Sequence, residues 1–327
     1  YYCFDALIVS TLASRIGRMD VAKKYGDTAA RVADAFNKRF LKGDRYSASR
    51  FSDAELAEKI KSWLNVLPPE QRPAIMKRYA TLYSSSSQTA NLLPLYLDIV
   101  PDENVREVVG TLIQDINFTR ASHINTGVVG LKFIFDVLMK YGNGELCYEL
   151  LNQTSFPSFG YQILKEGATT LWERWEFLSN DKCFNSHSHP FAGSVDVFFY
   201  KYLAGLRIEA PGFSKITIRP EPLGDLPYAS ASIDTPRGVL ACGWRKYGET
   251  LQMDVTIPCS AETTVYIPKN GHENVRVRDG ETVVYESGKE ISALADAADM
   301  DGYIRFTAEA GRYAFTVERL NNGTSKA

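Results

Sequence analysis

Pro211-Gly-Phe-Ser-Lys-Ile-Thr-Ile-Arg-Pro220 divides the chain, because the spacing of its apolar residues changes at this stretch. Before it, apolar residues recur every three or four positions, which is the period of a helix with one buried face. After it, apolar and polar residues alternate, which is the period of a strand with one buried face. We therefore expect a helical domain over residues 1–208 and a β domain over residues 209–327.

The helical part contains apolar stripes that are separated by glycines, prolines or serines. Short breaks of this kind join consecutive helices into antiparallel hairpins. The pattern suits a bundle, a solenoid or part of a toroid of hairpins, and the lack of a fixed-period repeat disfavours the solenoid. The expected helices cover residues 1–16, 21–40, 53–64, 70–79, 88–97, 101–116, 128–139, 144–151 and 193–206.

The β part contains short alternating segments that are bounded by turn pairs such as Asn270-Gly271 and Asp301-Gly302. Strands this short and this regularly spaced predict an antiparallel β-sandwich. The expected strands cover residues 215–219, 239–244, 251–257, 263–267, 282–285, 303–306 and 312–317.

Length and charge limit the classes of protein to which the chain can belong. Its 327 residues exceed what a single hydrophobic core supports, so two domains are expected. Its 37 basic and 39 acidic residues give a net charge of -2 without a basic stripe, so we expect no nucleic-acid partner. No apolar run has the length of a membrane span, so we expect no membrane partner.

The five cysteines are expected to be free, buried thiols. Their number is odd, no pair has C-x-x-C spacing, and none lies at a metal-ligand interval from a histidine. Glycine motifs that bind phosphates or dinucleotides are also missing, so we expect neither a metal nor a cofactor. The cysteines are Cys3, Cys147, Cys183, Cys242 and Cys259.

A stretch between the helices, made of residues 156–161, 166–176 and 185–190, fits neither period. Long irregular segments inside compact domains are usually functional. This stretch contains two of the chain's four tryptophans and two of its four histidines. This stretch is therefore the candidate site for binding or transforming a small molecule.

Trp172-Glu173-Arg174-Trp175 has the composition of a sugar pocket. Indole rings pack on the apolar face of a pyranose, and a carboxylate can activate a water or hold a hydroxyl. A glycosidase that inverts configuration needs such a base opposite a second, protonated carboxyl group. From these four residues alone, the interpretation as a pair of core tryptophans with a surface Glu173–Arg174 ion pair is favoured, and the sugar pocket stays open as the functional interpretation.

The histidines offer further candidates. His187 and His189 lie in a polar loop, and without a third ligand nearby a hydrogen-bonding role is favoured over zinc. A structural role is the alternative for both. His123 lies at a helix start that Thr119 or Ser122 could cap, and it also suits a purely structural role.

Several motifs together resemble glycoside hydrolase family 78, the bacterial α-L-rhamnosidases. The most specific is Gly167-Ala-Thr-Thr-Leu-Trp-Glu-Arg-Trp175, and the resemblance extends from about residue 1 to residue 325. The other matching stretches are Ser87–Asn91, His123–Gly130, Phe156–Tyr161, Asn185–Gly193, Tyr202–Leu206 and Pro211–Pro220.

The resemblance implies an (α/α)6 barrel followed by a β-sandwich, and release of terminal α-L-rhamnose with inversion by two glutamates. By motif position Glu173 corresponds to the general base, and His189 to the family histidine before the last barrel helix. Trp172 and Trp175 correspond to the aromatic positions around the base. With Arg174 and His123, these residues are the candidate substrate contacts, and the expected partner is a rhamnose-containing glycoside or polysaccharide.

The chain departs from the family pattern in two places. Phe159 stands where family members often carry Trp. The Gly-Trp-x-Gly-Asp run near the family's general acid is missing, and the amphipathic stretch from Tyr1 has no lead-in. We therefore expect an N-terminally incomplete toroid with an exposed apolar edge, whose partner is the missing N-terminal part and which is inactive alone.

Two alternatives remain. One is an (α/α)6-barrel glycosidase with a different sugar specificity, because sugar contacts in the missing region would set the substrate. The other is a carbohydrate-binding fragment without catalysis.

Overall fold

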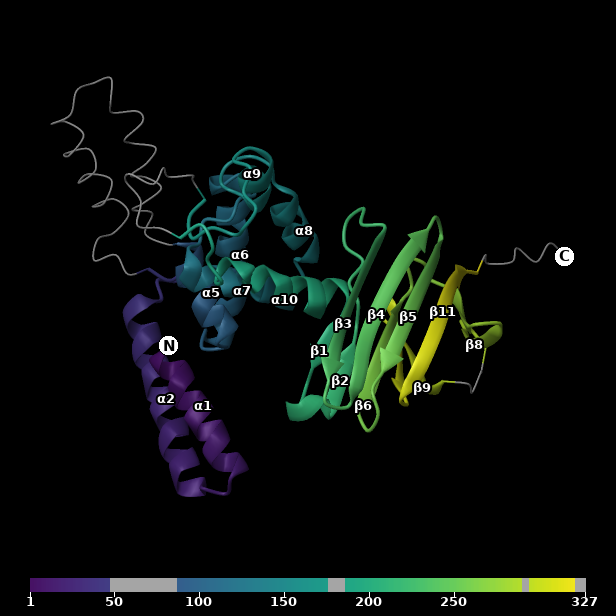
Figure 1. Ribbon diagram of the computed structural model, residues 1–327. Coiled ribbons are helices and arrows are strands. Elements are labelled where there is room, and N and C mark those ends of the chain that lie inside the picture. The colour runs from purple at the N-terminus through teal and green to yellow at the C-terminus, as the bar shows by residue number, and fades with distance from the viewer. Residues whose placement is uncertain (48–86, 176–185, 290–293, 321–327) are drawn as a thin grey trace. The chain divides into compact units, whose positions relative to one another are not determined.

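The computed structural model describes residues 1–47, 87–175, 186–289 and 294–320. The chain divides into two compact units, Tyr1–Ala192 and Gly193–Ala327. The first is helical and the second is built around two β-sheets, which confirms the predicted order of helices followed by a sandwich (Figure 1). The helices expected over 53–64 and 70–79, together with Cys183, lie outside the described residues.

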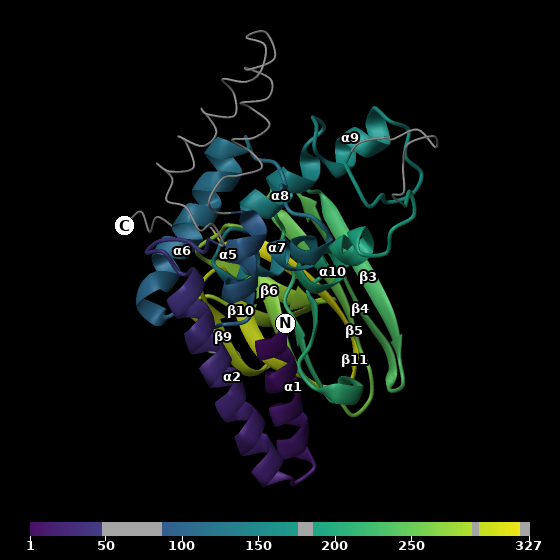
Figure 2. The same cartoon turned by 90° about the vertical axis from the view of Figure 1, so that its left-hand side faces the viewer.

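The first unit begins with a hairpin of α1 (Tyr2–Arg15) and α2 (Met19–Phe40), which lie side by side in Figures 1 and 2. Small buried residues at their contact, among them Ala6 and Ala29, allow the two helices to approach closely. The Ser10 hydroxyl donates to the carbonyl oxygen of Ala22 at 2.7 Å across the same contact. Large apolar side chains of α1 and of Ile16, which directly follows it, are exposed, and those on α1 include Leu7, Ile8 and Leu12.

The remaining described helices of this unit are shorter. They are α5 (Gln88–Tyr96), α6 (Asp102–Gln114), the π-helical turn η2 (Asp115–Thr119), α7 (Val128–Lys140), α8 (Gly144–Asn152) and α9 (Phe159–Leu164). The Ser87 hydroxyl caps α5 and the Ser158 hydroxyl caps α9 by accepting from backbone N–H groups of the first turn. Helix α7 is buried on most sides, which explains its almost continuous apolar sequence.

The observed helix bounds agree with the expected ones to within a few residues, except at two places. Helix α9 was not predicted, because its six residues are too few to show a helical period. The segment expected to be one helix over residues 193–206 is a 3-10 turn (Ala192–Val195), α10 (Asp196–Phe198) and the π turn η4 (Phe199–Leu203). Leu206 belongs to the first strand instead, because its side chain joins the sandwich core.

The second unit is a sandwich of two sheets with strand orders β1-β2-β6-β10-β9 and β3-β4-β5-β11-β7-β8 (Figure 2). All described strand pairs are antiparallel except β2 with β6, which are parallel. The bounds are β1 (Leu206–Ile208), β2 (Lys215–Ile218), β3 (Tyr228–Thr235), β4 (Gly238–Tyr247), β5 (Thr250–Ile257), β6 (Glu262–Pro268), β7 (Val275–Asp279), β8 (Thr282–Glu286), β9 (Ala295–Met300), β10 (Tyr303–Ala308) and β11 (Gly311–Arg319).

One continuous core lies between the two sheets. Alternate residues of the strands point into it, among them Trp244, Met253 and Phe315, as the period-two pattern predicted. The Trp244 indole donates to the carbonyl oxygen of Leu203 at 2.7 Å, so the end of η4 is tied to strand β4 within this unit.

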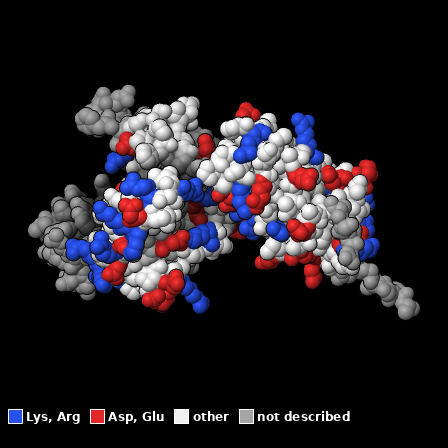
Figure 3. All heavy atoms as spheres, turned by 90° about the horizontal axis from the view of Figure 1, so that it is seen from below, with Lys and Arg blue, Asp and Glu red and all other residues white. Residues whose placement is uncertain are grey.

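Surface features agree with the composition. Basic and acidic side chains are interspersed on the face shown in Figure 3, without a field of one sign. None of the described helices is both long enough and apolar enough to span a bilayer. Of the described cysteines, Cys3, Cys147 and Cys242 are free and buried as predicted, whereas the free thiol of Cys259 is exposed.

Candidate active site

The helical unit contains a pocket of about 570 Å³. This volume lies within the range of sites for small ligands. Four stretches of the chain form its wall, and all of them belong to the first unit. The lining residues are Asn125, Thr126, Gly127, Val128, Leu131, Phe156, Pro157, Phe159, Trp172, Glu173, Arg174, Trp175 and Ala192.

Glu173 lies in an irregular segment that is hydrogen-bonded through its backbone to residues 186–189. The Glu173 N–H donates to the carbonyl oxygen of Ser186 at 2.9 Å, and the His189 N–H donates to that of Leu171 at 2.8 Å. The Ser186 N–H in turn donates to Oε2 of Glu173 at 3.0 Å. The carboxylate is therefore held by one backbone N–H, and Glu173 also lines the pocket.

The two tryptophans on either side of Glu173 are held by other rings. Trp172 is buried and stacks on His187 with ring centroids 4.6 Å apart. Trp175 contacts the edge of Phe159 at 5.1 Å. Phe159, which replaces the Trp common in the resembling family, thus supports the second indole as well as lining the pocket.

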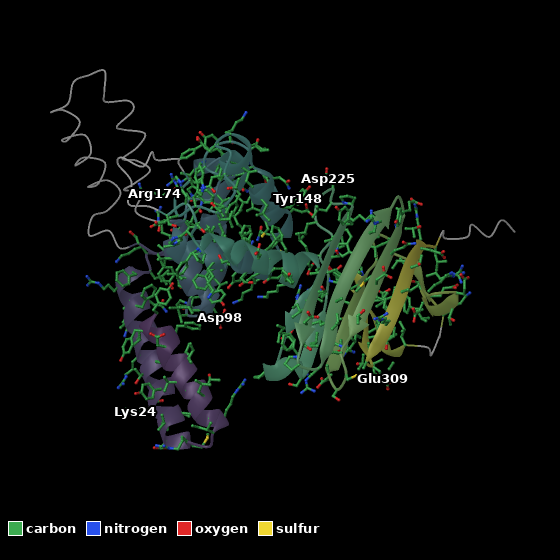
Figure 4. All side chains as sticks on the ribbon, viewed as in Figure 1. Lys24, Asp98, Tyr148, Arg174, Asp225 and Glu309 are labelled. Atoms are coloured by element: carbon green, nitrogen blue, oxygen red, sulfur yellow. The ribbon has the colours of Figure 1, made fainter. Side chains whose placement is uncertain are left out.

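The backbone of this segment depends on one buried amide. The Gln162 side chain on α9 is 1% exposed, and its Nε2 donates to the carbonyl oxygen of Arg174 at 2.6 Å. The backbone carbonyl oxygen of Gln162 accepts from the Ala168 N–H at 2.9 Å. The Arg174 residue itself is exposed, and its side chain is labelled in Figure 4.

The three histidine candidates do not line the pocket. His187 packs behind Trp172, and His189 stacks on Phe191 at 5.7 Å. His123 is bound at both ring nitrogens, to the carbonyl oxygen of Arg120 at 2.9 Å and to the Ser155 hydroxyl at 2.8 Å. Of the predicted site residues, the structure therefore brings Trp172–Trp175 together at the pocket and places the histidines outside its wall.

A second wall of the pocket is made by the loop that precedes α7, and α5 supports this loop. Gln88 is 1% exposed, donates to the carbonyl oxygen of His123 at 3.1 Å and accepts from the Asn125 N–H at 2.7 Å. The hydroxyls of Thr89 and Thr126 are 2.6 Å apart. The stretch Ser87–Asn91 therefore supports the loop before α7. This role accounts for its place among the stretches that resemble the rhamnosidase family.

Sequence reasoning missed the pocket residues Asn125, Thr126, Phe156 and Pro157. All four lie in the stretches that carried the resemblance, so that signal was present. It did not distinguish side chains that line a cavity from those that hold the backbone.

Two family models match the chain. The bacterial alpha-L-rhamnosidase 6 hairpin glycosidase domain matches residues 1–203, and the bacterial alpha-L-rhamnosidase C-terminal domain matches residues 205–281. The first match covers more than half of the chain.

Individual relatives agree with these models. An alpha-L-rhamnosidase of Formosa agariphila is 31% identical over 236 residues, which are 71% of this chain and 25% of that protein. One of an Alteromonas species is 34% identical over 177 residues, which are 53% of this chain and 19% of that protein. The chain thus spans a quarter or less of the length of these curated relatives.

Solved structures show the same architecture. The alpha-L-rhamnosidase from Dictyoglumus thermophilum superimposes with a TM-score of 0.80 and 35% identity, over 97% of this chain and 31% of that one. The Streptomyces avermitilis alpha-L-rhamnosidase complexed with L-rhamnose has a TM-score of 0.73 at 24% identity, over 97% of this chain and 26% of that one. The second likeness supports the fold alone.

Proposed function

The chain belongs to the bacterial α-L-rhamnosidase family, and we propose on this basis that its pocket takes part in the hydrolysis of terminal α-L-rhamnosides. The observation that carries the proposal is a carboxylate, that of Glu173, fixed by a backbone N–H between two indoles in the wall of one pocket. The relatives from Formosa agariphila and the Alteromonas species are named alpha-L-rhamnosidases, which supports the same class of substrate.

Inversion of configuration is the proposed stereochemical course, with Glu173 as general base. Its Oε2 accepts a hydrogen bond from Ser186, which fixes the plane of the carboxylate and leaves Oε1 to take a proton from the attacking water. Trp172 and Trp175 would hold the apolar face of the sugar beside it. The remaining requirement is a protonated carboxyl group on the other side of the glycosidic bond.

We place this general acid on a segment of the longer protein outside these residues. Among the described residues that line the pocket, Glu173 supplies the only carboxylate. The curated relative from Formosa agariphila is about four times as long as the part that matches. The same segment would cover the exposed apolar side of α1, and it is the partner that the 327-residue chain needs for turnover.

Replacement of Glu173 tests the proposal. In the protein that contains this chain, we expect Glu173→Gln to lower kcat on an aryl α-L-rhamnoside by about 10²–10⁴-fold, because the amide cannot accept the proton. Glu166→Gln is the matched control, since Glu166 lies in the same stretch, bonds to Tyr161 and does not line the pocket. Activity of Glu173→Gln within tenfold of wild type would remove Glu173 from the mechanism.

The anomer formed first tests the stereochemistry. Proton NMR during hydrolysis of an α-L-rhamnoside should show β-L-rhamnose before mutarotation, because water attacks the face opposite the leaving group. α-L-Rhamnose as the first product would contradict inversion. A panel of aryl glycosides distinguishes a rhamnosidase from a glycosidase with another specificity.

Sugar binding without turnover is the second candidate function for the 327-residue chain on its own. The single carboxylate among the described lining residues favours it. Measurable rhamnose binding by this chain, with no hydrolysis by the longer protein, would establish it.

A further inference from the structure

We propose that Asn125 is a hydrogen-bond donor to a hydroxyl of the bound sugar, and that Arg120 is the positioning residue that sets its orientation. The inference rests on the proposed function, because it assigns a residue to the same pocket. It concerns the loop before α7, whose polar side chains form a network behind the cavity.

The chemistry of the Arg120 guanidinium decides the orientation of the Asn125 carboxamide. A guanidinium has only donors, so it can face the amide oxygen but not the amide nitrogen. With Oδ1 toward Arg120, that oxygen accepts from Nε at 3.2 Å and from Nη2 at 3.1 Å. The two N–H groups of Nδ2 then lie on the side away from Arg120, in a residue that lines the pocket.

The backbone of the loop is fixed as firmly as this side chain. The Asn125 N–H donates to Gln88 Oε1 at 2.7 Å, and the Gln88 amide nitrogen donates to the carbonyl oxygen of His123. His123 in turn links the loop to Ser155, which precedes the pocket residues Phe156 and Pro157. The carboxamide is therefore held at both its backbone and its oxygen.

Arg120 is itself held in place by Asp115. Its side chain is 9% exposed, its Nε lies 3.7 Å from Asp115 Oδ1, and its N–H donates to the carbonyl oxygen of Asp115 at 2.9 Å. The next two residues, Ala121 and Ser122, have φ angles of 50° and 57°, so the backbone turns sharply there. Burial raises the pKa of Asp115, although the Arg120 charge and a hydrogen bond from Gln88 act in the opposite direction.

A buried ion pair of this kind contributes little net stability, because desolvation of both charges offsets their attraction. The effect of the Arg120–Asp115 pair here is to hold the guanidinium that orients the neutral Asn125 carboxamide. Such a donor complements Glu173, whose carboxylate only accepts when ionised, and Thr126, whose hydroxyl is paired with Thr89, and it adds to the Arg174 guanidinium in the same wall. Sugar oxygens that accept hydrogen bonds need a donor, and Nδ2 of Asn125 supplies one.

Asn125→Asp tests the donor directly. A carboxylate keeps the acceptor for Arg120 and has nearly the same shape, but it loses the two N–H groups and adds one negative charge, a charge change that Asn152→Asp also makes. We expect the Kd for methyl α-L-rhamnoside, measured by titration NMR on the 327-residue chain, to rise at least tenfold. The melting temperature should be unchanged or higher, because Asp pairs with Arg120. Asn152→Asp, the same change on α8 outside the pocket, should bind like wild type.

Arg120→Lys tests the positioning step. Lysine keeps the charge beside Asp115 but loses the planar two-pronged contact with the carboxamide. We expect the Kd to rise several-fold, and the double variant with Asn125→Asp to lose less than the product of the two single effects. A purely structural role predicts the opposite pattern, in which Arg120→Lys lowers the melting temperature and leaves the Kd unchanged.

The outcomes separate this inference from the function on which it rests. If wild type binds the rhamnoside and Asn125→Asp binds it within twofold, the inference is wrong and the proposed function stands. If wild type shows neither binding nor hydrolysis of a rhamnoside, in this chain or in the longer protein, both are wrong.

Discussion

Gly130 on α7 is the residue that allows α5 to support the pocket. A Cβ at this position would lie 1.9 Å from Oγ1 of Thr126 and 2.6 Å from Oγ1 of Thr89, the two hydroxyls that bond to each other. Neither distance can be accommodated without moving the loop or the helix. The Thr89–Thr126 hydrogen bond therefore requires a residue without a side chain at position 130.

Gly130→Ala should consequently lower both stability and sugar binding. We expect a loss of about 1–3 kcal/mol in the free energy of unfolding, measured by urea denaturation, because the alanine overpacks this contact. The matched control is Gly110→Ala on α6, where an added Cβ meets nothing within 4 Å. That change should stabilise the helix by about 0.5–1 kcal/mol. Equal stability of the two variants would contradict the packing argument.

At the level of single residues, the sequence predicted only part of the site. Trp172–Trp175 could be found because its four residues are consecutive and carry an unusual combination of groups. Asn125 could not be assigned, because its place in the wall depends on Gln88, 37 positions earlier in the chain. The histidines suggested ligand contacts, but hydrogen bonds and stacking to other protein groups decide their positions.

Among the elements, most strands with strong alternation were predicted, but β7, which alternates Val with Arg over Val275–Asp279, was missed. β5 and β11 alternate large apolar residues with polar ones, which produces a clear period of two. β3 was missed because half of its residues are Ala and Ser, whose contrast in hydropathy is small. β1 has only three residues, and its pairing with β2 depends on the chain reversal at Pro211–Phe213.

The connection from β2 toward β3 is held by a charged cluster around Glu221. Arg207 Nη2 donates to Glu221 Oε1 at 2.9 Å, and the Tyr303 hydroxyl donates to Glu221 Oε2 at 2.5 Å. Arg219 lies over the Tyr303 ring at 4.5 Å. The cluster therefore ties β1, the end of β2 and β10 together within the second unit.

This cluster predicts a loss of stability at alkaline pH. Burial, with a smaller effect of Glu221, raises the pKa of Tyr303 well above its usual value. The folded chain then keeps a proton that the unfolded chain loses from about pH 10 upward. The contribution of Tyr303 is complete below pH 10 and declines as the pH rises toward the folded-state pKa.

Tyr303→Phe should reduce this decline. We expect the free energy of unfolding, measured in urea between pH 8 and 11, to fall less steeply above pH 10 in the variant than in wild type. Tyr247→Phe, a change at an exposed tyrosine of β4, is the control and should keep the wild-type slope. Identical slopes for Tyr303→Phe and wild type would show that the Tyr303 proton does not contribute.

On the scale of the whole molecule, the helical half followed by a sandwich was predictable because the two periods differ so clearly. The sequence also predicted an apolar edge, and α1 exposes a stripe of large apolar side chains. Leu12 is 57% exposed and Ile16 is 76% exposed, whereas Cys3 and Ala6 on the other side of the helix are buried. Contiguous apolar surface of this kind favours association with other surfaces.

The stripe on α1 should therefore drive self-association of the 327-residue chain. We expect Leu12→Lys with Ile16→Lys to shift the chain toward monomer in sedimentation velocity runs, at equal concentration and salt. The melting temperature should change little, because both side chains already face solvent. Val239→Lys is the control, since Val239 on β4 is 46% exposed but lies outside the stripe, and it should leave the association of wild type unchanged. If the double variant associates as strongly as wild type, another surface is responsible, and α1 loses its proposed role as the contact for the rest of the protein.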